Sequence, residues 1–377
     1  MSTNLFKLIR DIYQTTDGIP LHAPSFGGNE KKYVIEAIDS TFVSSVGKFV
    51  DQFELEVSGF VDAQSATATV NGTAALHVAL LLAGVQPGDL VLTQPLTFIA
   101  TCNAIAYSGA EPVFVDVDRA TLGLSAHAAE IWLQENAEVR EGGCFHKDSG
   151  RIVRACLPMH TFGHPVDVDG LLALCAKWHL VLVEDAAESL GSYYKGRHTG
   201  TFGIVGTLSF NGNKVITTGG GGMIIGSKEI GKKAKHLTTT AKIPHAYEYA
   251  HDLVGYNYRL PNLNAALGCA QMESLPAYLA SKRQIASRYR DFFSNQDVLF
   301  VDEPESCQSN FWLNAVICPD VEYRNSLLRS ANSVGIGMRP IWQLMNNMPA
   351  FKNCLAGSLE TAHWLEQRVV NLPSSPV

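Results

Sequence analysis

Short apolar runs alternate with longer stretches of helical periodicity between Ser65 and about Ile225. This alternation is typical of repeated β-α units, in which helices cover both faces of a mostly parallel sheet. The apolar runs predict strands at 66–70, 90–93, 113–116, 154–159, 181–184, 205–210 and 222–225. The periodic stretches predict intervening helices at 74–83, 99–108 and 168–178.

The segments that flank this region have a different pattern, which is mainly helical. Apolar spacing predicts helices at 5–13, 30–41, 278–293 and 321–334, a further helix that starts near Lys48, and a strand at 311–317. Asn29 precedes the second of these helices and is a candidate N-cap. We therefore expect a large domain, residues 1–237, that includes the N-terminal helix, and a smaller α+β domain, residues 238–377.

Composition narrows the function classes. The chain has 377 residues, 46% of them hydrophobic, and a formal net charge of −7 without a basic stripe, so nucleic acid is not expected as a partner. No run approaches the length of a membrane span and the first residues do not form a signal peptide, so we expect a cytoplasmic protein. The eight cysteines are scattered without a CxxC pair, and no metal site is expected.

Candidate chemistry gathers where the predicted strands end. Lys214 lies in a Gly/Asn turn after strand 205–210, with the hydroxyl of Ser209 five residues upstream. Such a lysine is able to form a Schiff base beside an anion site, although a solvated turn lysine gives the same local pattern.

Three further motifs follow other strands at the same predicted edge of the sheet. Gly72-Thr73 opens a helix, where unpaired N–H groups and the helix dipole favour a phosphate. Phe98 offers a ring face, and Asp185 ends a buried strand, where a carboxylate needs a partner. Taken singly, each of these motifs is equally well explained by an ordinary structural role. Together with Lys214 and Ser209 they supply the needs of one cofactor, pyridoxal 5′-phosphate (PLP).

Over nearly its whole length the chain resembles the DegT/DnrJ/EryC1/StrS family of sugar-nucleotide aminotransferases. The similar motifs lie at 26–30, 72–76, 97–98, 112–116, 184–187, 209–214, 255–259 and 264–268. The resemblance implies the type I fold of aspartate aminotransferase, with a mostly parallel central sheet and a smaller C-terminal α+β domain. It also implies PLP as cofactor, passing through its pyridoxamine phosphate form.

The resemblance implies a role for each matching residue. Lys214 resembles the Schiff-base lysine, Asp185 the partner of the pyridinium nitrogen, Phe98 the stacking residue, Glu188 a residue near the phenolic oxygen, and Gly72, Thr73 and Ser209 the phosphate ligands. Asn257 and Arg259 resemble a segment that reaches the neighbouring subunit's phosphate site, which implies a homodimer with shared active sites. The chain departs from the family pattern at Asn71, where serine is common, and at Asn211, where histidine is usual.

The reaction implied is transfer of an amino group from L-glutamate to a keto-sugar nucleotide in surface-glycan biosynthesis, for lipopolysaccharide or capsule. Segments 24–30, 43–48 and 337–342 are similar to the branch that acts on UDP-4-keto-6-deoxy-N-acetylglucosamine, of the legionaminic acid or bacillosamine type. Candidate substrate residues are Asn29, Ser45, Arg339 and Trp342.

Three alternatives stay open. The first is an aminotransferase of the perosamine type, acting on GDP-4-keto-6-deoxymannose. The second is a PLP-dependent sugar dehydratase, against which Lys214 argues because such enzymes characteristically lack this lysine. The third is a catalytically silent regulatory or binding protein with the same fold.

Overall fold

Within residues 2–377, which the computed structural model describes, the central element is a seven-stranded sheet. Its strands are β1 (Ser65–Thr69), β2 (Leu90–Thr93), β3 (Glu111–Phe114), β6 (Val153–Leu157), β7 (Val181–Asp185), β10 (Val205–Ser209) and β11 (Gly222–Gly226). They lie in the order β1-β11-β10-β7-β6-β2-β3, and only β11 runs antiparallel to its neighbours. The prediction of a mostly parallel sheet is confirmed, with a strand at each predicted place.

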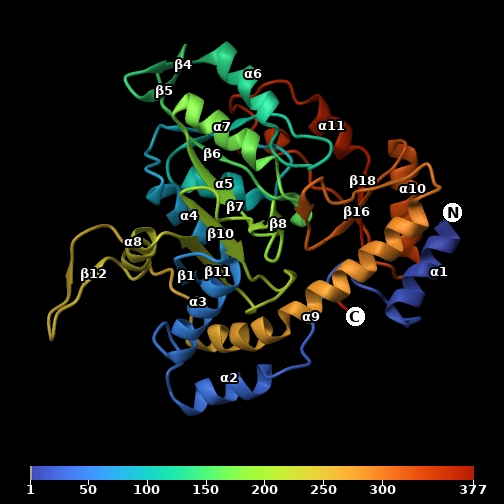
Figure 1. Cartoon of the computed structure of the whole chain (residues 1–377), viewed down its shortest axis with the longest axis horizontal. Helices are drawn as coiled ribbons and strands as arrows, with labels where there is room; N and C mark the ends of the chain where they lie inside the picture. The colour runs from blue at the N-terminus through green and yellow to red at the C-terminus, as the bar shows by residue number, and fades with distance from the viewer. Residues whose placement is uncertain (1) are drawn as a thin grey trace.

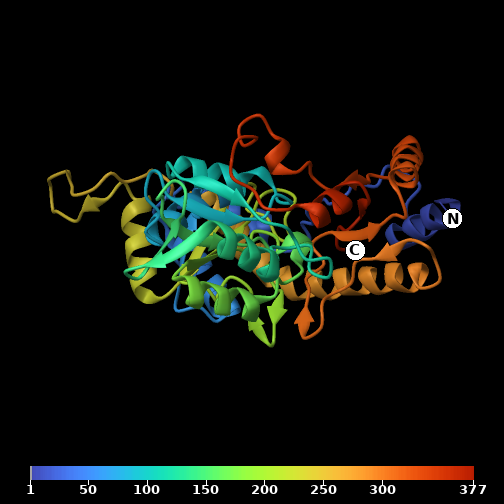
Figure 2. The ribbon, with the colours of Figure 1, turned by 90° about the horizontal axis from the view of Figure 1, so that it is seen from above.

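Helices enclose this sheet between two layers (Figures 1 and 2). They include α4 (Gly72–Leu82), α5 (Ile99–Tyr107), α6 (Ala126–Asn136), α7 (Val168–Trp178) and α8 (Lys228–Thr238). In β2, Leu90 and Leu92 join the apolar cluster of α6 and α7, whereas Val91 joins that of α4, α5 and α8. Successive side chains of a strand point to opposite faces, so β2 is apolar throughout because both of its faces are buried.

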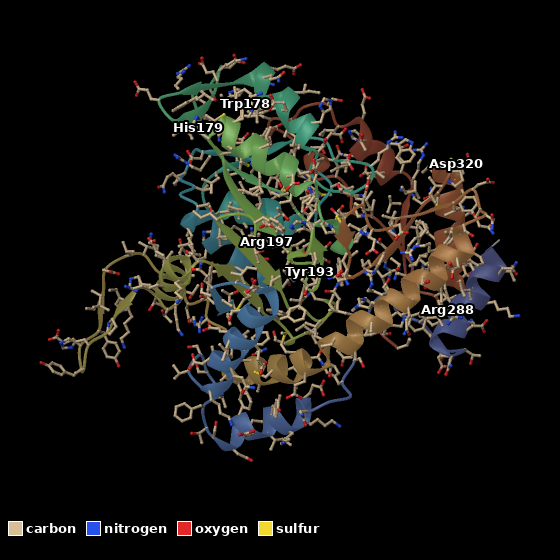
Figure 3. The ribbon with its side chains drawn as sticks, in the orientation of Figure 1. Trp178, His179, Tyr193, Arg197, Arg288 and Asp320 are labelled. Atoms are coloured by element: carbon tan, nitrogen blue, oxygen red, sulfur yellow. The ribbon has the colours of Figure 1, made fainter. Side chains whose placement is uncertain are left out.

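The ends of several helices follow local chemistry. Helix α7 ends at Trp178, as predicted, because His179 adopts a left-handed backbone conformation with φ 55° (Figure 3). Helix α10 (Val321–Ser333) begins after Asp320, whose carboxylate accepts a hydrogen bond of 2.8 Å from the backbone N–H of Tyr323 (Figure 3).

The structure corrects the start of one predicted helix and the cap of another. The helix predicted at 278–293 is the second half of α9 (Asn262–Phe293), which continues through Pro276. Its first residue, Asn262, accepts hydrogen bonds from the backbone N–H groups of Phe49 and Val50, and so ties the start of α9 to the start of α3 (Lys48–Val61). The side chain of Asn29 does not cap α2 (Glu30–Asp39) but donates to Glu273 of α9 at 2.7 Å.

The C-terminal part of the chain forms an antiparallel sheet beside α9. Its strands, in order, are β14 (Leu299–Phe300), β16 (Asn314–Ile317), β18 (Val369–Leu372) and β17 (Arg339–Pro340). The same part of the chain contains the helices α10 and α11 (Glu360–Glu366). Helix α1 (Ser2–Tyr13) buries Leu5 and Ile9 in the same apolar cluster as Tyr289 and Leu327, and it lies beside α10 in Figure 1. The division into residues 1–237 and 238–377 stays a proposal, and this packing favours grouping α1 with the smaller part.

Short elements complete the fold. They are the hairpins β4 (Ala137–Arg140) with β5 (Gly143–His146) and β12 (Lys242–Ile243) with β13 (Ala250–His251), the small sheet of β8 (Tyr193–Tyr194), β9 (Arg197–His198) and β15 (Cys307–Gln308), and 3₁₀ turns at Thr161–Gly163 and Met345–Asn347. The β12–β13 hairpin projects from the body of the chain (Figure 1). In residues 2–377 we find no helix with the length and apolarity that a bilayer crossing requires.

Two glycines give opposite expectations for stability. A Cβ on Gly206 of β10 would lie 2.0 Å from the backbone oxygen of Gly200, whereas a Cβ on exposed Gly59 of α3 would have no atom within 4 Å. We expect Gly206→Ala to lower the free energy of unfolding by about 1–3 kcal/mol or more, because backbone must move. Gly59→Ala should raise it by about 0.5–1 kcal/mol. Urea unfolding of both variants beside the wild type measures this, and equal midpoints would contradict the packing of β10.

Candidate active site

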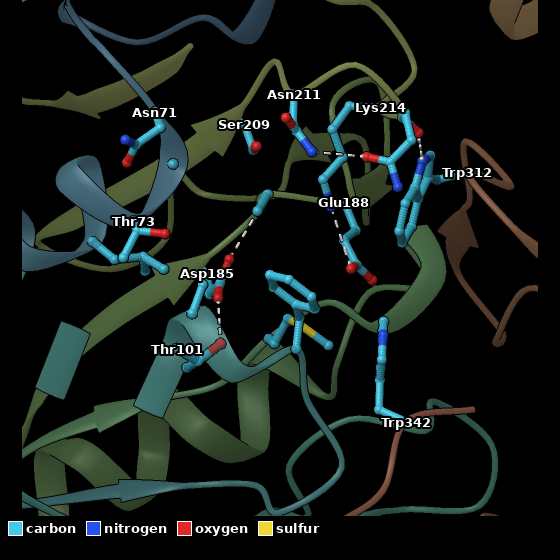
Figure 4. A pocket seen from close by; sticks show the side chains of 17 residues that line it. Asn71, Thr73, Thr101, Asp185, Glu188, Ser209, Asn211, Lys214, Trp312 and Trp342 are labelled. Atoms are coloured by element: carbon cyan, nitrogen blue, oxygen red, sulfur yellow. Dashed lines mark hydrogen bonds and ion pairs between the residues drawn. The ribbon is translucent and has the colours of Figure 1, made fainter. Parts of the chain in front are cut away.

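A cavity of about 300 Å³ opens where β2, β7 and β10 end and α4 begins (Figure 4). Its lining brings together many of the residues that the sequence singled out, namely Gly72, Thr73, Phe98, Asp185, Glu188, Ser209, Lys214 and Trp342. These come from distant parts of the chain, and they meet because the carboxyl ends of parallel strands share one edge of the sheet.

The N-terminus of α4 forms one end of this cavity. Gly72 and Ser209 approach so closely that a Cβ on Gly72 would lie 2.9 Å from the Cβ of Ser209. Asn71 caps the helix, since its side-chain oxygen accepts from the backbone N–H of Ala74 at 2.8 Å, so the departure from serine keeps a capping residue. The first N–H groups of a helix have no partner within the helix, so this narrow cradle fits a phosphate.

Asp185 lies at the end of β7 with only 2% of its surface exposed. Its carboxylate accepts from the hydroxyl of Thr101 at 2.8 Å and from the N–H of Ala187 at 3.1 Å, and within residues 2–377 it forms no salt bridge. Burial raises its pKa despite these hydrogen bonds. A buried carboxylate without a paired cation fits the protonated ring nitrogen of PLP, which would supply the missing positive charge. The sequence did not indicate Thr101, which lies in the first turn of α5.

Lys214 faces Glu188 across the other end of the cavity (Figure 4). Its Nζ lies 3.3 Å from Oε1 of Glu188 and 3.9 Å from the ring centroid of Trp312. The second carboxylate oxygen of Glu188 accepts from the backbone N–H of Phe162 at 2.9 Å. Burial raises the pKa of Glu188 to about 7, although the charge of Lys214 opposes this shift. Lys214 thus lines the same cavity as Asp185 and the phosphate cradle.

Two of these residues had no useful signal in the sequence. Trp312 reads as part of an apolar strand, and Phe162 as a loop residue. Phe162 adopts a left-handed backbone conformation, φ 57°, which is uncommon for a bulky side chain and aims its N–H at Glu188.

Asn211, the second departure from the family pattern, belongs to the turn that carries Lys214. Its side-chain amide donates to the side chain of Asn213 at 3.2 Å, and the backbone N–H of Lys214 donates to its carbonyl oxygen at 3.0 Å. The indole N–H of Trp312 donates to the backbone oxygen of Asn213 at 2.6 Å. Asn211 therefore stabilises the turn through these two hydrogen bonds, and it also lines the cavity.

Other candidate residues lie away from this cavity. Ser45, Asn257 and Arg259 line a second hollow at the base of the β12–β13 hairpin. The guanidinium of Arg259 is buried and forms a salt bridge of 2.6 Å with Glu54.

Asn29 and Arg339 lie in neither place. The amide of Asn29 is turned toward α9, where it donates to Glu273, and Arg339 is exposed on β17, where it donates to Asn332 at 2.9 Å. The structure of one chain does not bring them to the cavity, and their contact with substrate stays a prediction. In the described part of the chain, His, Cys, Asp and Glu form no cluster suited to a metal ion.

A mostly parallel sheet with a lysine, a buried aspartate and a phosphate cradle at its carboxyl edge is the arrangement of PLP-dependent enzymes of fold type I. The sequence model of the DegT/DnrJ/EryC1/StrS aminotransferase family matches residues 24–377, and the chain belongs to this family. The family and its PLP-dependent enzymatic class thus agree with the resemblance seen in the sequence.

Individual relatives agree over the same length. A GDP-perosamine synthase from Escherichia coli O157:H7 is 36% identical over 359 residues, which cover 95% of this chain and 93% of the relative. A putative pyridoxal phosphate-dependent aminotransferase, EpsN, from Bacillus subtilis (strain 168) is 36% identical over 91% of this chain and 86% of its own. Among solved structures, the aminotransferase TlmJ from Streptoalloteichus hindustanus has a TM-score of 0.85 and 26% identity, with 95% of this chain and 93% of that one covered.

The raised pKa of Glu188 makes a prediction for the cofactor-free protein. Unfolding returns this pKa from about 7 toward the ordinary 4.5, so the folded state holds the proton more tightly. Stability should therefore fall as pH rises from about 4.5 to 7, by up to roughly 3 kcal/mol from this group. Glu188→Gln should flatten that part of the profile, measured as the free energy of unfolding of both proteins at pH 5, 6 and 7. Parallel profiles would show that Glu188 ionises normally.

Proposed function

We propose that the protein transfers an amino group from L-glutamate to a GDP-linked 4-keto-6-deoxy sugar, as a perosamine-type aminotransferase. The observation that carries this proposal is that several relatives, which match nearly the whole chain, are described as GDP-perosamine synthases. The UDP-linked sugar favoured by the sequence motifs has less support and becomes the competitor in the test.

The residues of the cavity support a division of labour for this reaction. PLP, when bound, supplies an electron sink for the carbon from which a proton is removed. We assign Gly72, Thr73 and Ser209 to its phosphate, Asp185 to its ring nitrogen and Phe98, which is 50% exposed at the cavity, to its ring face.

Proton movement is assigned to Lys214 with Glu188 beside it. The amine of Lys214 would take the proton from the α-carbon of the amino donor and deliver it to the cofactor carbon that takes up the nitrogen, and in the second half-reaction it would move a proton in the opposite direction. Glu188, 3.3 Å away and with a pKa of about 7, holds that amine in the cavity and is itself near its titration point at neutral pH. The presence of Lys214 also supports transamination over sugar dehydration or a silent binding role.

We further propose that the active protein is a homodimer in which each site uses residues from both subunits. Ser45, Asn257 and Arg259 share a hollow outside the Lys214 cavity, so one chain does not place them at its own site. Large side chains of the adjoining hairpin region are exposed, including Tyr247 at 83% and Tyr249 at 84%, which is typical of a surface that another chain covers.

A substrate panel tests the proposed function. Protein loaded with PLP should lose its visible colour on addition of L-glutamate and regain it with GDP-4-keto-6-deoxymannose, with kcat/KM at least about tenfold above that for UDP-4-keto-6-deoxy-N-acetylglucosamine. The Lys214→Ala variant, which keeps the rest of the cavity, should show neither change. Preference for the UDP sugar would reject the nucleotide assignment, and no response to any keto sugar would reject the aminotransferase proposal.

A mixing experiment tests the shared sites. Asn257→Asp places a carboxylate where the phosphate of the PLP in the partner's site is proposed to lie. Lys214→Ala removes the reactive amine of a subunit's own site, so each variant alone should be inactive. Co-expression of both in equal amounts should restore about a quarter of the wild-type activity, because half of the dimers then hold one intact site. Activity that stays at background, with dimers present by light scattering, would place both residues in the same subunit's site.

A further inference from the structure

A short strap, residues 14–23, follows α1 and lies before the family match begins at residue 24. Backbone hydrogen bonds fix it to the C-terminal part of the chain. The N–H of Ile19 donates to the oxygen of Gly335 at 2.8 Å, the N–H of Gly337 donates to the oxygen of Ile19 at 2.7 Å, and the N–H of Ser374 donates to the oxygen of Leu21 at 2.7 Å. The strap thus holds His22 in a set position.

His22 meets Lys282, a lysine of α9 whose surface is entirely buried. The amino group of Lys282 donates to Nε2 of His22 at 2.9 Å, to the backbone oxygen of Trp312 at 3.2 Å and to the backbone oxygen of Ser374. Within residues 2–377 no carboxylate pairs with it, and burial lowers its pKa well below the ordinary value. The three partners of this amine come from three different segments, the strap, the Trp312 backbone and the Ser374 backbone, so Lys282 joins them at one point.

Trp312 is therefore held from both sides of its backbone. Its carbonyl accepts from Lys282, and its N–H donates to the side-chain oxygen of Asn310 at 2.7 Å. Asn310 in turn donates to the backbone oxygen of Glu188 at 2.9 Å. The indole N–H and ring face of Trp312 contact the Lys214 turn, as described above.

We propose that His22 and Lys282 are positioning residues of the active site, which hold Trp312 so that its ring keeps the amine of Lys214 beside Glu188. Burial, and after it the positive charges of Lys282 and Lys214, lower the pKa of His22, which therefore stays neutral and accepts from Lys282. The proposal rests on Lys214 as the reactive amine of the proposed function, and it does not depend on which sugar is the acceptor.

The position of Trp312 is measurable without cofactor or substrate. The chain has five tryptophans, so a ¹H–¹⁵N spectrum of the cofactor-free protein should show five indole signals, and the one lost in Trp312→Phe identifies Trp312. We expect His22→Leu and Lys282→Met to move this signal and leave the other four in place. His22→Asn, which keeps a side-chain acceptor for Lys282, should leave it near its wild-type position. An unmoved Trp312 signal in both His22→Leu and Lys282→Met would overturn the proposal.

A double-mutant cycle tests whether the effect reaches Lys214. His22→Leu should slow the half-reaction with saturating L-glutamate by about tenfold, with the half-saturating concentration unchanged within about twofold. Trp312→Leu should slow it at least as much, and the double variant should be no slower than Trp312→Leu alone. Effects that multiply would show that His22 acts independently of Trp312 and would reject the proposal. Because this half-reaction uses no sugar, rejection of the GDP-sugar assignment leaves the result readable.

A matched control separates positioning from stability. Tyr13 of α1 donates its hydroxyl to the backbone oxygen of Ser375 at 3.2 Å, and it contacts neither Lys282 nor Trp312 through a hydrogen bond. Tyr13→Phe should lower the melting temperature without changing the half-reaction rate or the Trp312 signal. Equal slowing in Tyr13→Phe and His22→Leu at equal loss of stability would show that the strap has only a structural role.

Discussion

The structure of the site depends on the burial of two carboxylates, Asp185 and Glu188, beside a single amine. Both side chains are 2% exposed, yet only Glu188 has a salt bridge, to Lys214. Removing two negative charges from water against one positive charge is unfavourable unless protons or hydrogen bonds compensate. The raised pKa of each carboxyl is the expression of this imbalance. A ligand that brings a positive ring nitrogen to Asp185 would relieve this imbalance, and the protonated ring nitrogen of PLP is such a group.

Neighbouring segments stabilise the two buried carboxylates by donating hydrogen bonds to them. The hydroxyl of Thr101 in α5 and the backbone N–H of Ala187 donate to Asp185. The backbone N–H of Phe162, which has a left-handed conformation, donates to Glu188. These donors come from the segments that follow β2, β6 and β7, which are adjacent strands of the sheet. The arrangement depends on strand order, because only neighbouring parallel strands place such segments within hydrogen-bond distance.

Much of the sheet could be predicted from the sequence, since most of its strands are short, largely apolar runs. The meeting of Lys214, Asp185 and Gly72 in one cavity could be predicted too, because each lies at or shortly after the end of a strand. The start of α9 was not predicted, and its first residue, Asn262, binds backbone groups of α3 that lie more than 200 positions earlier, a contact that no local pattern indicates. Trp312 and Lys282 were missed for the same reason. An apolar-strand tryptophan and a lysine within a charged helix look ordinary until the chain folds and brings them to Lys214 and His22.

These missed residues share a location, at the junction between the cavity and the C-terminal part of the chain. Lys282 satisfies acceptors from the strap, from Trp312 and from Ser374, so a displacement of any of these segments leaves a buried polar group without its partner. Such a junction resists small independent movements, because buried unpaired groups are costly. If Lys214 moves protons as proposed, its amine has to return to one position in each turnover, and the strap would help to fix that position from residues outside the part that matches the family.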